Sequence, residues 1–262
     1  MSQITLALGR IGEAQVIGFF LVLARVSPLF VLAPLFSSKM IPARVKGTVA
    51  VALTIGLTGV ATQGQHITAQ PLELLGLILE ELLVGFAFAF SIGALLAAVE
   101  VAGALTDAVA GFSFGGLIDP VNGNQGGVLT QLYSLVGLAT FIAIGGDAWM
   151  LRGFARTFTL VPLTKGPRLG PLVAGAVQAF SSIFSSAIEV AAPALLALVI
   201  TDVAFGMVSR VVPQLNVFAV GFPFKVGVSL LVVGASLPFL GGWMSDQITT
   251  SVGTALHALQ IA

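Results

Sequence analysis

The sequence contains no cysteine, two histidines and few charged residues. The absence of cysteine excludes disulfides and thiolate metal sites, and nothing in the sequence suggests that His66 and His257 meet. Charged residues make up 8% of the 262 residues, against about 25% in a typical soluble domain. We therefore expect no metal and no cofactor, and too little polar surface to cover a globule in water.

An excess of charge of either sign is also missing. Eleven lysines and arginines balance eleven aspartates and glutamates, so the formal net charge is zero. Binding to nucleic acid depends on a clustered basic excess, and nucleic acid is therefore not an expected partner. No small-residue cleavage site follows Arg10 and Glu13, so we expect an uncleaved start rather than a signal peptide.

Long apolar runs are what the sequence has in place of charge, with 57% hydrophobic residues and a mean hydropathy of +1.06. A helix needs about 20 apolar residues to cross a bilayer core of about 30 Å. The runs are continuous rather than alternating, which favours helices over a barrel. The sequence thus predicts an all-α polytopic membrane protein, in contact with membrane lipids, whose six or so helices form hairpins. The expected segments are Ala14–Leu35, Gly47–Ala61, Leu82–Val99, Leu132–Trp149, Ala187–Val212 and Val226–Trp243, with 172–186 as a further helix or an extension of the fifth.

The loops between these segments break the rule that cytoplasmic loops are basic. Three basic residues between 39 and 46 place the first loop in the cytoplasm, and simple alternation then places the fourth loop outside. Yet residues 152–168 carry four basic side chains. Either the segment count is wrong or some hydrophobic segments do not span the bilayer, and we favour the second interpretation.

Several charges lie within or beside the apolar segments. Arg25 lies near the middle of the first segment, and Glu80 and Glu81 precede the third. A charge at the centre of a spanning helix costs about 2.5–3.5 kcal/mol even on a lenient insertion scale, so such side chains face protein or water. We favour ion pairing between helices, or snorkelling from helix ends, over an ion or proton path.

A glycine- and phenylalanine-rich loop is expected at residues 106–127, inside a mostly non-spanning stretch from 100 to 131. A hydrophobic loop between glycines is costly in water, so it is buried in protein or fills a cavity. A re-entrant packing element and a movable plug in a pore both fit, and these residues alone favour the packing element. The candidate plug residues are Gly111, Phe112, Phe114, Gly115, Gly116 and Leu117.

A polar hairpin tip follows the fifth segment. Pro213 lacks an N–H and disfavours helical geometry in the residue before it, so the helix is expected to end there. Gln214 and Asn216 can satisfy the freed backbone groups at the turn. The candidate residues for subunit contact or gating are Arg25, Glu80, Glu81, Arg210, Gln214, Asn216 and Lys225.

Several stretches together carry a resemblance that extends over nearly the whole chain. They are RVSPLF at 25–30, IPARVK at 41–46, EELLVG at 80–85, Asp119-Pro120 followed by Asn124-Gln125, and PQLNVF at 213–218 with GFP at 221–223. In this order and spacing the chain resembles the FliR family of flagellar biosynthetic proteins, which also includes the export-gate T subunit of injectisomes.

The resemblance implies a core subunit of the flagellar type III export gate, in the bacterial inner membrane at the flagellar basal body. Such a subunit helps form and seal the channel through which unfolded flagellar proteins cross. It implies FliP and FliQ as partners, together with the export components FlhB and FlhA. It further implies a FliP-like region at 1–171 with a plug-like loop at 106–127, and a FliQ-like hairpin at 172–262. Some helices of such an assembly lie partly above the membrane plane, which would account for the basic fourth loop.

Three alternatives remain at this point. An injectisome export-gate subunit fits the same residues. A small-solute secondary transporter would show interrupted segments in two matching halves, and the sequence has no such symmetry. An intramembrane enzyme needs a paired-carboxylate, nucleophile–base or metal constellation. Glu80 and Glu81 are adjacent and point about a third of a turn apart on a helix, so we expect no enzyme activity.

Overall fold

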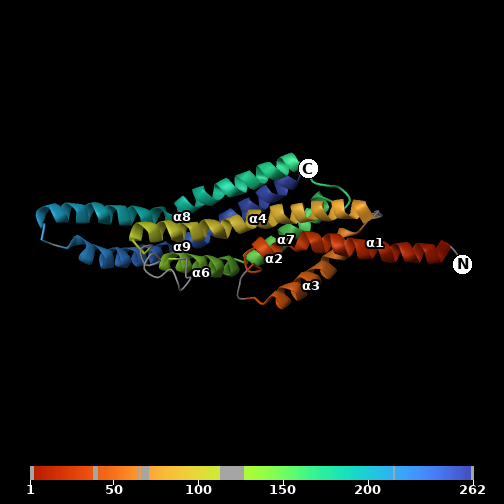
Figure 1. Cartoon of the computed structure of the whole chain (residues 1–262), viewed down its shortest axis with the longest axis horizontal. Coiled ribbons are helices and arrows are strands. Elements are labelled where there is room, and N and C mark those ends of the chain that lie inside the picture. The colour runs from red at the N-terminus through yellow and green to blue at the C-terminus, as the bar shows by residue number, and fades with distance from the viewer. Residues whose placement is uncertain are drawn as a thin grey trace. The chain divides into compact units, whose positions relative to one another are not determined.

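The computed structural model describes residues 3–37, 41–63, 65, 71–112, 127–214 and 216–260. Within these residues every regular element is a helix, which confirms the all-α prediction (Figure 1). Five helices are long and apolar enough to cross a membrane, or six if α6 and α7 count as one broken span. The helices are α1 (Gln3–Val26), α2 (Leu29–Leu32), α3 (Ala43–Ala61), α4 (Pro71–Ala110), α6 (Val128–Ala143), α7 (Gly146–Leu160), α8 (Leu169–Val211) and α9 (Val217–Gln260).

Contacts divide the chain into two compact units. Unit 1 comprises residues 1–93, 146–180 and 248–262, and unit 2 comprises residues 94–145 and 181–247. Helices α4, α8 and α9 therefore each contribute one part to unit 1 and another to unit 2.

Unit 1 is built around an aromatic core. Phe88 of α4 packs against Phe154 of α7 with ring centres 5.7 Å apart, and Phe154 packs against Phe158 at 5.6 Å. All three side chains are buried, and Val84 of α4 packs in a buried apolar cluster with Leu259 of α9. The four-residue spacing of Val84 and Phe88, and of Phe154 and Phe158, places each pair on one helix face, which is why these faces turn inward.

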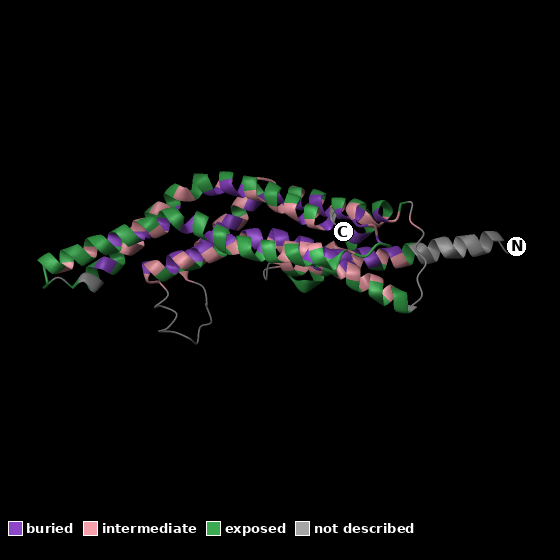
Figure 2. Ribbon diagram, turned by 90° about the horizontal axis from the view of Figure 1, so that it is seen from above, coloured by how far each residue is buried: buried purple, intermediate pink, exposed green. Residues whose placement is uncertain are grey.

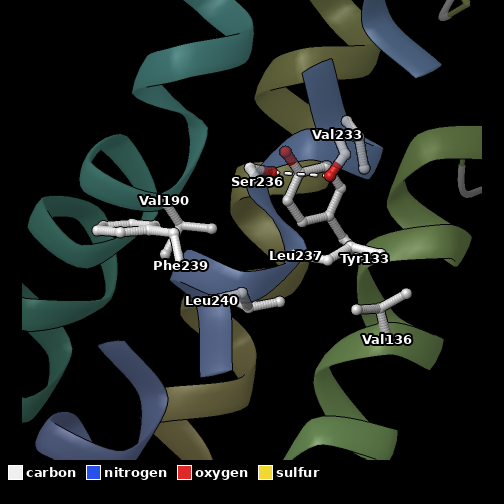
Figure 3. Close-up of a pocket in the computed structure, with 8 residues that line it drawn as sticks. All are labelled: Tyr133, Val136, Val190, Val233, Ser236, Leu237, Phe239 and Leu240. Carbon is white, nitrogen blue, oxygen red and sulfur yellow. Dashed lines mark hydrogen bonds between the residues drawn. The ribbon is translucent and has the colours of Figure 1, made fainter. Parts of the chain in front are cut away.

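Unit 2 packs parts of α4, α6, α8 and α9 together. Its interior contains Leu129 and Phe141 of α6, Leu198 of α8 and Met244 of α9, all fully or nearly fully buried. A shallow recess opens beside Tyr133 of α6 (Figure 3). Eight residues line this recess and none is charged, so it offers no cluster of groups for a reaction or a metal.

The helices differ from the expected segments mainly in their ends. The first segment is broken at Ser27-Pro28 into α1 and α2, because Pro28 has no N–H to continue the hydrogen-bond ladder. The fourth segment is broken before Gly146 into α6 and α7. The stretch 172–186 extends the fifth helix, the second of the two expected possibilities.

Most helices also extend beyond the predicted limits, and α4 and α9 do so at both ends. Helix α4 starts at Pro71 rather than Leu82 and continues to Ala110, so residues 100–110 of the expected non-spanning stretch are helical. Helix α9 starts at Val217 rather than Val226 and contains Pro223. One proline removes a single ladder bond, and the helix continues through it.

The two basic stretches belong to the same compact unit. Residues 39–46 and 152–168 both fall in unit 1, and the interpretation that some hydrophobic segments do not span the bilayer stays a prediction. Unit 1 contains nine lysines and arginines and five acidic residues, whereas unit 2 contains two basic and six acidic residues. A chain with zero net charge is thus divided into a basic unit and an acidic unit.

Candidate functional site

A buried ion pair joins α1 to α4 inside unit 1. Arg25, in the last turn of α1, is 0% exposed, and Glu81 of α4 is 2% exposed. The guanidinium binds the carboxylate of Glu81 in a bidentate manner. Its Nε atom donates to one carboxylate oxygen, and an Nη atom donates to the other at 2.8 Å. Ion pairing between helices, the favoured interpretation of the sequence, is therefore confirmed for these two residues. A role of either in subunit contact or gating stays a prediction.

The same guanidinium contacts the carboxyl end of α7. One Nη donates to the carbonyl oxygen of Thr157 at 3.0 Å, and the other donates to the carbonyl oxygen of Val161 at 2.9 Å. The Thr157 carbonyl also accepts from the N–H of Val161, whereas Val161 itself lies just beyond the last helical residue, and a cation at this end is favourable to the helix dipole. The guanidinium also lies 4.5 Å from the ring centre of Phe158. Arg25 therefore ties three helices together.

Helix α4 approaches α1 closely at this pair. Gly85 lies one turn after Glu81, and a Cβ atom added to it would overlap the carbonyl oxygen of Arg25. Only glycine allows this separation of the two backbones. Glu80 faces elsewhere, since a Cβ atom on Gly166 would come within 2.6 Å of its carboxylate carbon. The adjacent glutamates therefore occupy different sites, as their spacing predicts.

A second buried residue, Asp107, lies in unit 2 near the end of α4 and is 2% exposed. Its main-chain oxygen accepts hydrogen bonds from the N–H groups of Gly111 at 3.0 Å and Phe112 at 3.1 Å. Its carboxylate accepts from the N–H groups of Leu129 at 3.0 Å and Thr130 at 2.7 Å, and from the Thr130 hydroxyl. One residue thus holds the end of α4 and the start of α6, and we call this set of hydrogen bonds the Asp107 clasp.

Asp107 therefore fixes both ends of the segment 113–126. Gly111 ends α4 with a φ of +92°, in the left-handed region that favours glycine, and the bond from Phe112 spans the five residues typical of a helix C-cap. The carboxylate acts as the N-cap of α6, although it comes from another helix. The remaining plug candidates lie outside the described residues: Phe114, Gly115, Gly116 and Leu117.

Asp107 is not among the residues predicted from the sequence, because residues 106–110 were expected in the loop and not in α4. The glycine four residues later was the signal that could have placed Asp107 in the last turn of a helix.

Lys225 lies close to this clasp within unit 2. Its ammonium forms an ion pair with Asp202 of α8 and donates to the carbonyl oxygen of Val109, in the last turn of α4, at 3.4 Å. Phe222, three residues earlier on α9, meets the ring of Phe112 edge-on at 6.0 Å between ring centres. Lys225 thus has partners within its own chain, and contact with a neighbouring subunit stays a prediction for it.

The hairpin tip between α8 and α9 is exposed. Arg210, Pro213, Gln214 and Asn216 all face outward, and the ribbon here is largely green in Figure 2. Helix α8 ends two residues before the proline, as predicted. The Asn216 side chain accepts a hydrogen bond from the N–H of Ala219 at 3.1 Å and so caps α9. A test of partner contact at this tip should therefore leave Asn216 intact.

These features define a polytopic helical membrane protein with a buried ion pair in unit 1 and with the end of α4 and the start of α6 anchored at one buried aspartate in unit 2. The sequence matches the family model described as bacterial export proteins, family 1, over residues 16–251. The chain belongs to this family, and its resemblance to FliR proteins is confirmed.

Individual relatives agree with this assignment. The chain is 27% identical to the flagellar biosynthetic protein FliR of Escherichia coli (strain K12), over 85% of each chain. It is 30% identical to the protein of that name from Bacillus subtilis (strain 168), over 85% of this chain and 87% of the relative. It is also 23% identical to the surface presentation of antigens protein SpaR of Shigella flexneri, over 80% of each chain.

Proposed function

We propose that the protein is a core subunit of the export gate of a flagellar type III secretion apparatus, located in the inner membrane at the flagellar basal body. It helps form and seal the channel through which unfolded flagellar proteins cross. Membership of the bacterial export family supports the export role. An injectisome is the second candidate, because SpaR is also a relative. We favour the flagellum because identity to the FliR relatives named above, 27% and 30%, exceeds the 23% to SpaR.

The Asp107 clasp is the observation that best supports a sealing role. The main-chain oxygen and the carboxylate of Asp107 hold the residues on either side of the segment 113–126 at one buried point. The candidate plug residues Phe112, Phe114 and Leu117 are apolar and suit a closure that excludes water and binds no ion. A closure is needed because a membrane potential works on each leaking ion, by about 2.3 kcal/mol per charge per 100 mV.

Substitution of the two phenylalanines tests this role. Cells carrying Phe112→Ser with Phe114→Ser should become permeable to small ions and grow more slowly, while some export persists. The matched control, leucine at both positions, keeps apolar bulk and should keep the channel sealed. If the serine variant leaves ion permeability unchanged but prevents assembly of the complex, the segment is a packing element and the sealing role is wrong.

We further propose that the chain works only within a hetero-oligomer with FliP and FliQ, in contact with FlhB, FlhA and unfolded substrates. Helix α8 exposes apolar side chains such as Ile188 and Val203, yet Glu189 and Asp202 beside them are exposed as well. Acidic side chains are costly against lipid, so this surface is better suited to a protein neighbour. Purification of a co-expressed set in mild detergent should retain FliP and FliQ. A stable monomer that ignores them would contradict the proposal.

The proposed division into a FliP-like region, 1–171, and a FliQ-like hairpin, 172–262, rests on the family resemblance. Helix α8 begins at Leu169, close to this boundary, and α8 and α9 follow it as two consecutive long helices. The compact units cut across the division because both helices contribute to both units. The division therefore concerns descent rather than packing.

A further inference from the structure

Helix α7 presents one narrow polar stripe to the outside. Trp149, Arg152, Arg156 and Thr159 are exposed and follow one another at spacings of three, four and three residues, which places them on one face of the helix. The opposite face is buried, with Phe154 packed against α4. We call these four exposed residues the α7 stripe.

The positive charge of the α7 stripe is not compensated by neighbours. Among the residues that the structure describes, neither Arg152 nor Arg156 forms an ion pair. Asp147 belongs to the first turn of α7, before the stripe begins. Glu81 is engaged with Arg25, and unit 1 as a whole has nine basic residues against five acidic ones. Like charges one turn apart also repel each other, so an anion between the two arginines would be favourable.

We propose that the α7 stripe binds the phosphate-bearing headgroups of anionic membrane lipids. Helix α7 has 15 residues, a length of about 22 Å, which is too short to cross a core of about 30 Å alone. Tryptophan is enriched at the headgroup level of membranes. The planar guanidinium of arginine can donate two hydrogen bonds at once to the oxygens of a phosphate. An acidic protein segment would satisfy the arginines but gives no reason for an indole 47% exposed beside them. This inference does not depend on the proposed sealing role.

The tryptophans of the chain offer a direct test. The protein has two, so Trp243→Phe leaves Trp149 as the sole fluorescent tryptophan. The full-length variant is reconstituted into phosphatidylcholine nanodiscs that contain equal mole fractions of either brominated phosphatidylglycerol or brominated phosphatidylcholine. The phosphatidylglycerol should quench Trp149 more strongly, with a relative association constant higher by about fivefold for each arginine. High salt should weaken this preference.

Three variants in the same background decide the outcome. Arg152→Gln with Arg156→Gln should abolish the preference, lysine at both positions should retain it, and Arg210→Gln, an exposed arginine of unit 2, should not affect it. Equal quenching by the two lipids in the parent, or a preference that survives the double glutamine change, would overturn the proposal. So would a Trp149 that is shielded from both lipids and cross-links to an acidic co-expressed subunit, because the stripe would then face a protein.

Discussion

Glu81→Ala removes one half of the buried pair and leaves the guanidinium of Arg25 in place. That cation then retains the carbonyl oxygens of Thr157 and Val161 and the more distant Thr157 hydroxyl, at 3.5 Å, as acceptors, with no opposite charge. Removal of one partner from a buried ion pair typically costs about 3–5 kcal/mol. Since folded proteins are stable by about 5–15 kcal/mol in total, the variant should lose a large part of its stability.

Arg25→Met should cost more than Glu81→Ala. It leaves the carboxylate buried without a counter-charge, and it also removes the donor to the end of α7. The carbonyl of Thr157 keeps its helical bond from the N–H of Val161, at 2.9 Å. The carbonyl of Val161 loses the guanidinium, and a buried acceptor without a donor costs about 1–3 kcal/mol. This loss should remain in the double variant with methionine at both positions, although replacement of a buried pair by apolar residues is often close to neutral.

The assay is thermal unfolding in detergent, followed by tryptophan fluorescence because the chain has no cysteine for thiol dyes. The expected order of stability is the parent, then the double methionine variant, then Glu81→Ala, then Arg25→Met. Arg210→Met is the matched control, because Arg210 is exposed and should tolerate the change. A double variant as stable as the parent would show that the contact with α7 contributes nothing. A Glu81→Ala variant as stable as the control would refute the argument from burial.

Three further changes have distinct expected outcomes. Asp107→Ala removes the N-cap of α6, at a cost of about 1 kcal/mol, and should raise ion permeability while export persists; unchanged permeability would argue against the clasp. Gly85→Leu should lower the melting temperature, since overpacking costs about 1–3 kcal/mol; Gly56→Leu is its control, because a Cβ atom there has nothing within 4 Å. Alanine at both Arg210 and Gln214 should reduce motility with a normal membrane level of the protein, and unchanged motility would make the tip a simple turn.

The sequence was sufficient for the class of protein and for the centres of its helices, but not for their lengths. A search for about 20 apolar residues finds the part of a helix that could cross a bilayer. Helix α4 has 40 residues and begins at Pro71, where Glu73 and Glu80 make its first part more polar than the predicted segment. The break at Pro28 was missed because apolar residues continue on both sides of it.

The site could be predicted only in part. Arg25 and Glu81 stand out in the sequence because charges are rare in apolar segments. Their further partners at Thr157 and Val161 are backbone carbonyls, which any residue provides and no side-chain pattern reveals. The basic stretches 39–46 and 152–168 belong to one unit, and a charge rule applied along the chain does not detect this.

The length of α8 and α9 affects how much of the protein can accumulate in the cell. With 43 and 44 residues, each helix is about 65 Å long, roughly twice the thickness of the bilayer core. Large apolar side chains are exposed along α8 from Leu169 to Val211, a greater length than lipid can cover. A newly made copy therefore carries apolar surface that only another protein can shield from water. Copies made in excess of their partners should aggregate or be degraded, so the supply of partner subunits would set how much of this protein accumulates.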